Sequence, residues 1–160
     1  MTRGPNLVFI SCGQVTERER NLGTAVAALI RELTPYEPYF AENQSSLEAL
    51  TTNVLDALNH SVGLIAIMHP RGAVAFNGTG ECIRASVWIE QEIAIAAFMV
   101  QVLDRPLRVA AYIHKDIARE GMRAELQLNP VLFRRDDEVL AHLRLILPTW
   151  TKSAAIAKAQ

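Results

Sequence analysis

Glu92 is the residue with the clearest potential for chemistry, because helical spacing puts its carboxylate on the apolar side of a helix. At about 100° per residue, Glu90 and Gln101 point away, while several largely apolar neighbours fall within about 60° of Glu92. These neighbours are Trp88, Ile89, Ile95, Ala96 and Met99. A buried, unpaired charge is costly. Glu92 is therefore either a functional group at the edge of a cleft or one half of a buried salt bridge.

Short polar segments follow three apolar runs and could form a site together with Glu92. They are residues 11–14 (Ser-Cys-Gly-Gln), 42–44 (Glu-Asn-Gln) and 69–72 (His-Pro-Arg-Gly). If the apolar runs are parallel strands, these segments meet at one edge of the sheet, where ligands bind in open α/β folds. The start of the Glu92 helix lies at the same edge. This convergence favours a functional role for Glu92.

The elements that must position these residues alternate between strands and helices. Apolar runs predict five strands, at residues 7–11, 37–41, 62–68, 107–113 and 131–133. Helical stripes lie between them, with a capping box of Thr16 and Glu19 before one and Asp136 before the last. Such alternation predicts a flavodoxin-like, doubly wound, five-stranded parallel sheet with helices on both faces. The glycine-containing residues 73–80 predict a long loop before the Glu92 helix.

Composition limits the function classes. The chain has 160 residues, 50% of them hydrophobic, which suits one domain (residues 1–150) followed by an alanine-rich tail (151–160). A net charge of −1 with scattered basic residues argues against direct nucleic-acid binding. Two distant cysteines show no metal-ligand spacing and suit a reducing compartment. Without an apolar run of about 18 residues, a cytoplasmic protein without membrane contact is expected.

Further ligand-binding candidates come from the polar segments. Ser11, Cys12 and Gly13 could contact a ribose or a phosphate, although a small turn requires such residues anyway. Asn43 is a candidate from the second segment. His69 could polarise a ligand or simply cap its strand.

Arginines and an aromatic residue complete the set of candidates. Arg71 or Arg84 could bind a diphosphate through a guanidinium group, or could be solvated. Trp88 could line a pocket, but anchoring of its helix in the core is the favoured interpretation. The sequence contains neither the G-x-G-x-x-G motif nor the G-x-x-x-x-G-K motif, so a nucleotide would be held in another way.

Two segments resemble TIR domains. Ser86-x-Trp88-Ile89-x-x-Glu92 is similar to the family's S-x-W-C-x-x-E motif, with isoleucine in place of cysteine, and residues 8–11 (Val-Phe-Ile-Ser) resemble its first strand. The resemblance implies that Glu92 is the catalytic residue for cleaving the nicotinamide-ribose bond of NAD+. Ser86 and Trp88 of the motif are candidate substrate-binding residues, and neither a cofactor nor a metal is expected, with NAD+ as the substrate.

Two departures refine the resemblance. Residues 42–46 form a shorter segment than the docking loop of signalling TIR domains, and residues 71–84 form a longer one. The chain therefore resembles bacterial TIR-like antiphage effectors more than animal adaptors, and self-association or an activating partner protein is expected. The alternatives are a non-catalytic TIR interaction domain and a nucleoside deoxyribosyltransferase-like or nucleotide-sensing domain. With NAD+, attack by water would give ADP-ribose, and attack by an adenine nitrogen would give a cyclic product.

Overall fold

The fold is given by a computed structural model, which describes residues 6–40, 47–75, 80–118 and 130–157. The side chains of residues 47–52 and 152–157 are outside this description. Asn43, a candidate binding residue, also lies outside the described residues.

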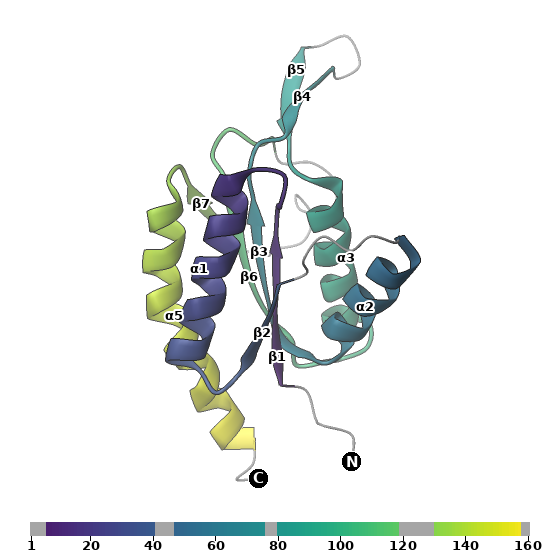
Figure 1. The fold of residues 1–160 in the computed structure, drawn as a ribbon. Helices are drawn as coiled ribbons and strands as arrows, with labels where there is room; N and C mark the ends of the chain where they lie inside the picture. The colour runs from purple at the N-terminus through teal and green to yellow at the C-terminus, as the bar shows by residue number, and fades with distance from the viewer. Residues whose placement is uncertain (1–5, 41–46, 76–79, 119–129, 158–160) are drawn as a thin grey trace.

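A five-stranded parallel sheet forms the centre of the molecule (Figure 1). Its strand order is β2-β1-β3-β6-β7, with every neighbouring pair parallel. The strands are β1 (Leu7–Cys12), β2 (Glu37–Phe40), β3 (Ser61–Met68), β6 (Arg108–His114) and β7 (Val131–Phe133). The predicted flavodoxin-like, doubly wound sheet is confirmed. Ligands in such folds bind at the carboxyl edge, near the point where the strand order reverses, and here that point is β1 and β3.

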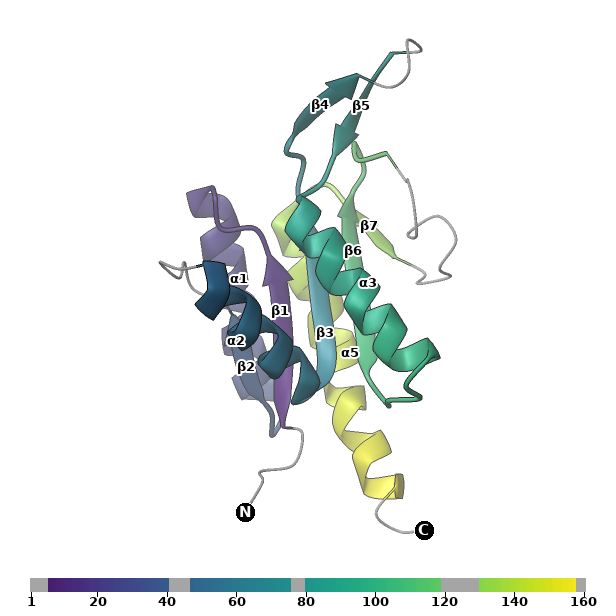
Figure 2. The same cartoon turned by 90° about the vertical axis from the view of Figure 1, so that its right-hand side faces the viewer.

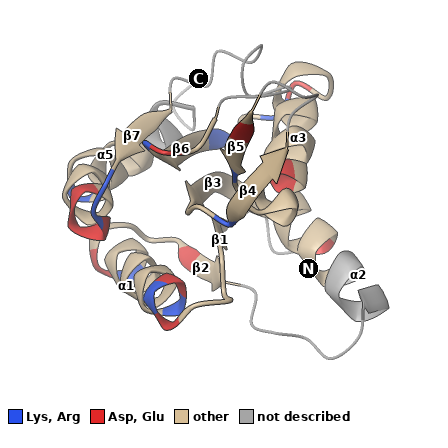
Figure 3. Ribbon diagram, turned by 90° about the horizontal axis from the view of Figure 1, so that it is seen from above, with Lys and Arg blue, Asp and Glu red and all other residues tan. Residues whose placement is uncertain are grey.

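Helices cover both faces of the sheet. Figure 3 shows α1 (Glu17–Leu33) and α5 (Asp136–Ala157) on one side of the strands, and α2 (Leu47–Asn59) and α3 (Val87–Gln101) on the other. Each side has its own apolar core. The capping box predicted for α1 is present, because Thr16 and Glu19 exchange side-chain and backbone hydrogen bonds. Helix α5 continues past residue 150 to Ala157, since alanine favours helix.

Successive residues of β1 face opposite cores. Val8, Ile10 and Cys12 pack with α1 and α5, whereas Phe9 packs with α2 and α3. This alternation follows from the two-residue period of a strand. Ser11 continues the Phe9 side, so the last two residues of β1 point to different faces of the sheet.

The prediction of a long loop at residues 73–80 is wrong for the residues that the structure describes there. The chain forms an antiparallel hairpin of β4 (Gly72–Ala75) and β5 (Glu81–Arg84), which projects beyond the carboxyl edge (Figures 1 and 2). A hydrogen bond from the Arg71 amide to the Arg84 carbonyl, 2.9 Å long, closes its base. Every residue of β4 is exposed, so this strand lacks the buried apolar face by which a strand is recognised in a sequence, whereas Ile83 of β5 packs against the core of α2 and α3.

None of the helices in the described ranges is both long enough and apolar enough to span a membrane.

Candidate active site

Glu92 lies in the second turn of α3, beside the carboxyl end of β1. Ser86 is the N-cap residue of α3, and the buried Ile89 and Ile93 hold the helix against the sheet. The hydroxyl of Ser11, itself buried, donates a hydrogen bond to Glu92 Oε2. The predicted convergence of Ser11 and Glu92 is therefore present in the structure.

The Glu92 carboxylate is partly buried but carries no compensating cation. Burial raises its pKa from 4.5 to about 7, against the smaller lowering effect of the Ser11 hydrogen bond. No Lys, Arg or His of the described ranges forms an ion pair with Glu92; Arg71 is paired elsewhere. The alternative that Glu92 closes a buried salt bridge therefore fails for this part of the chain. Glu92 is therefore a partly accessible carboxylate that is about half ionised at neutral pH.

Trp88 is not the core anchor that its helical position suggested. Its exposed fraction is 53%, and the neighbouring Val87 is exposed as well, whereas Ile89 is buried. In this turn Ile89, not Trp88, occupies the position that packs into the core of α2 and α3. Since Trp88 precedes Glu92 by one helical turn, it stands near the same side of the helix. It is thus available at the rim of the Glu92 site.

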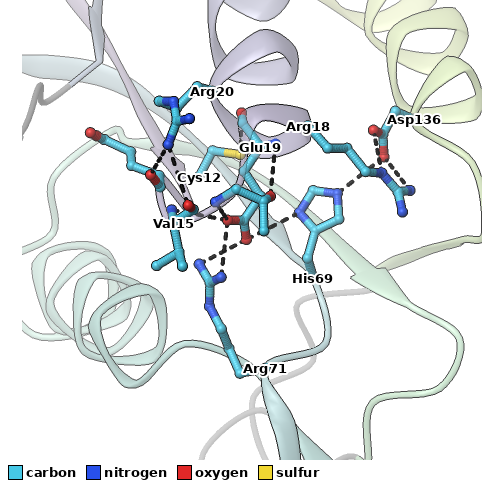
Figure 4. Close-up of polar contacts among 10 residues, drawn as sticks. Cys12, Val15, Arg18, Glu19, Arg20, His69, Arg71 and Asp136 are labelled. Carbon is cyan, nitrogen blue, oxygen red and sulfur yellow. Dashed lines mark hydrogen bonds and ion pairs between the residues drawn. The ribbon is translucent and has the colours of Figure 1, made fainter.

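A second polar cluster occupies the other face of β1 and is centred on Glu19 (Figure 4). The carboxylate of Glu19, only 2% exposed, accepts hydrogen bonds from the backbone amides of Val15 and Thr16 at 3.1 and 3.0 Å. Arg71 binds both of its oxygens, at 2.9 and 2.7 Å. Burial alone would raise the pKa of Glu19, but the Thr16 and Arg71 bonds outweigh it and hold the pKa below its usual value. Glu19 therefore joins the loop after β1 to the base of the hairpin.

His69 extends this cluster to α5. Its Nε2 lies 3.0 Å from Asp136 Oδ1, and Asp136 also accepts two hydrogen bonds from Arg18, at 2.7 and 2.8 Å. His69 Nδ1 is buried and has no hydrogen-bond partner among the described residues; Glu19 Oε1 is 3.9 Å away. His69 is thus a buried link between α1 and α5 rather than a simple strand cap.

The predicted binding residues consequently fall into two groups. Ser11, Ser86 and Trp88 lie with Glu92. Around Glu19 lie Cys12, Gly13, His69 and Arg71. Arg84 is exposed at the end of β5, where its carbonyl accepts the Arg71 amide.

Cys12 belongs to the Glu19 cluster because its side chain points away from Glu92. Its Sγ is 3.6 Å from the Glu19 carbonyl oxygen. Burial, followed by the charge of Glu19, raises the pKa of the thiol to about 12. Cys12 is therefore a protonated packing residue at neutral pH and lacks the thiolate that a nucleophile needs.

Replacing Gly13 with alanine should destabilise the protein by about 1–3 kcal/mol. A Cβ atom there would lie 2.5 Å from Glu19 Cδ and would overlap both the Glu19 carboxylate and the Arg71 guanidinium. The ion pair would have to move to make room. Urea unfolding of Gly13→Ala measures the loss, and an unchanged midpoint would show that the pair adjusts freely.

The fold and the site together define a flavodoxin-like α/β protein with a partly buried carboxylate at the ligand-binding edge of its sheet. No model of a known protein family matches the sequence, and no curated protein matches it significantly. Within the described ranges, no three His, Cys, Asp or Glu side chains are grouped so that they could hold a metal ion. The function is therefore inferred from the chemistry of Glu92 and its neighbours.

Proposed function

We propose that the protein is a TIR-like NAD+ glycohydrolase that cleaves the nicotinamide-ribose bond with Glu92 as its catalytic residue. The observation that carries the proposal is a partly accessible Glu92 carboxylate, hydrogen-bonded to Ser11 and free of any ion pair within the described residues. A structural glutamate that stays ionised at this position would need a cation to offset its burial. The location at the carboxyl edge, beside the strand-order reversal, adds support.

The reaction needs few protein groups. The bond between the ribose carbon and the pyridinium nitrogen breaks with both electrons moving to nitrogen, so nicotinamide leaves as a neutral molecule without a general acid. The sugar develops oxocarbenium character, and an ionised Glu92 stabilises this positive charge. Water then adds to the sugar carbon and releases one proton, giving ADP-ribose. Attack by an adenine nitrogen of the same molecule would give the cyclic product instead.

The biological setting belongs to the same proposal. By resemblance, the protein acts in the bacterial cytoplasm as an antiphage effector, and a second copy or an activating protein switches it on. The exposed strand β4 is compatible with association.

Incubation with NAD+ at high protein concentration, with chromatographic identification of products, tests the proposal. Release of nicotinamide together with ADP-ribose or its cyclic form is the expected result. If NAD+ stays intact at every protein concentration while 2′-deoxynucleosides lose their bases, the deoxyribosyltransferase-like alternative replaces it. If neither substrate reacts, the non-catalytic interaction domain becomes the better interpretation.

Replacing Ser11 with alanine should shift the pH profile of NAD+ cleavage. Because ionised Glu92 is the active form, activity should rise with pH around the Glu92 pKa of about 7. The Ser11 hydrogen bond lowers this pKa, so its removal should move the rise toward higher pH by roughly half to one unit. Ser61, a buried serine at the amino end of β3, provides the control Ser61→Ala. An identical profile for Ser11→Ala and native protein would argue against control of activity by Glu92 ionisation.

A further inference from the structure

Tyr39 is a half-buried residue of the edge strand β2 that stands beside the Ser11 and Glu92 pair. It is the register partner of Phe9, which lies two residues before Ser11 on the same side of β1. Its ring stacks on Phe9 with a centroid distance of 5.3 Å and an interplanar angle of 30°. The strand register and the stacking fix Tyr39 on the α2 and α3 side of the sheet, the side of Glu92.

The Tyr39 hydroxyl is an unused hydrogen-bond donor. It forms no hydrogen bond with any described residue, and it is not among the buried polar atoms of the described ranges that lack a partner, so it reaches solvent. Burial and, after it, the charges of Glu92 and Asp56 raise the pKa of the phenol, which keeps its proton at neutral pH. The hydroxyl is therefore a protonated donor on the side of the sheet that carries the Glu92 and Asp56 carboxylates.

The chemistry of Glu92 and Tyr39 determines which ligand group could bind to both. An ionised Glu92 can only accept hydrogen bonds, whereas the Tyr39 phenol is available as a donor. A ligand group that lies between them must both donate and accept. An aliphatic hydroxyl does both, while a phosphate would be repelled by Glu92 and Asp56 and an amide carbonyl could only accept.

We infer that Tyr39 is a substrate-binding residue that donates a hydrogen bond to a ribose hydroxyl of the ligand, opposite Glu92. This inference rests on the proposed glycohydrolase function. This role gives β2 a part in substrate selectivity. The site favours ribosides that carry this hydroxyl over their deoxy analogues, because a bound analogue offers the Tyr39 donor no acceptor at that position.

The test compares Tyr39→Phe with native protein on NAD+ and on its analogues lacking the 2′- or 3′-hydroxyl of the nicotinamide ribose. The Phe9 stacking is kept in this variant, so folding should be preserved. We expect kcat/KM for NAD+ to fall about 3- to 10-fold, and the loss to disappear with the analogue that lacks the bonded hydroxyl. Tyr36→Phe is the matched control, because Tyr36 packs against the core on the other face.

The outcomes separate the two proposals. Equal losses with NAD+ and both analogues, or no loss with NAD+, would overturn the role of Tyr39 and leave the glycohydrolase function standing. Absence of turnover by native protein would overturn the function and this inference with it. An absorbance titration of the tyrosines provides a readout independent of turnover. The titration step of Tyr39 is identified by its absence in Tyr39→Phe. This step should occur at lower pH in Glu92→Gln than in native protein.

Discussion

Glu92→Gln should lose at least about a hundredfold of NAD+ cleavage activity and, at pH 8, should be more stable than native protein by about 1–3 kcal/mol. The two effects share one cause. The carboxylate is desolvated at the sheet edge and no cation of the described residues offsets its charge, so the ionised form that the reaction needs is also the form that strains the fold. A pKa raised from 4.5 to about 7 sets the scale of the gain, reduced for partial exposure.

The raised pKa of Glu92 also determines how the stability difference between Glu92→Gln and native protein changes with pH. Because the folded pKa of Glu92 lies above the unfolded value, the native state binds the extra proton between pH 4.5 and about 7. Native stability therefore falls as pH rises through this range, and Glu92→Gln should not follow the fall. The difference in unfolding free energy should be largest above pH 7 and should vanish below pH 4.5. Urea unfolding at pH 4, 6 and 8 measures it.

Glu90→Gln is the matched control, since Glu90 is also partly buried and precedes Glu92 by two residues on α3. It should keep its NAD+ cleavage activity, which separates the loss of Glu92 from the general loss of a carboxylate on α3. A Glu92→Gln variant less stable than native protein at pH 8 would contradict the argument, because that is the behaviour of a glutamate held in a structural ion pair.

Helices and strands were predictable from the sequence where burial or helix capping leaves a clear pattern. The continuous apolar run at β3 reflects burial on both faces, and the α1 helix begins at its predicted cap and ends before Pro35. The hairpin of β4 and β5 has neither signal. Its strands have four residues each and β4 is exposed throughout, so the glycines of this stretch predict a loop.

The candidate site was predictable where sequence spacing translates directly into space. Helical periodicity placed Glu92 toward the sheet, and the common carboxyl edge brought Ser11 to it. The strand period of two, applied to β1, would also have separated Cys12 from Ser11. Tyr39 required the register between β1 and β2, which the sequence does not contain.

Glu19 was missed for a different reason: a local pattern already accounted for it. The capping box with Thr16 explains a glutamate at this position of α1 completely. Nothing in the sequence links it to Arg71, which lies 52 residues further along the chain. The same residue thus fulfils a local and a long-range role, and only the local role leaves a recognisable spacing.

Glu19→Gln should destabilise the protein at pH 7 by about 2–4 kcal/mol, the opposite of the Glu92 result. Glutamine keeps the shape but presents an amide donor to the Arg71 guanidinium, leaving a partly buried cation without its partner. The Val15 and Thr16 amides already share Oε2, so a glutamine whose oxygen keeps these two bonds turns its amide group toward Arg71 in place of Oε1. The loop after β1 and the base of the hairpin should therefore loosen together.

The pH dependence of this second variant also has the opposite sign. The folded pKa of Glu19 is below its usual value of 4.5, so its stabilisation is complete above that pH and is lost as pH falls through the folded pKa. The gap between native protein and Glu19→Gln should accordingly be largest at neutral pH and should narrow in acid, as measured by urea unfolding. Glu17→Gln, an exposed first-turn change in the same helix, is the control. Equal urea midpoints for the Glu19 and Glu17 variants would mean that the ion pair adds nothing to stability. The expected results differ in sign: as pH rises, Glu19→Gln should become less stable relative to native protein and Glu92→Gln more stable. That contrast would separate a glutamate that stabilises the fold from one that strains it.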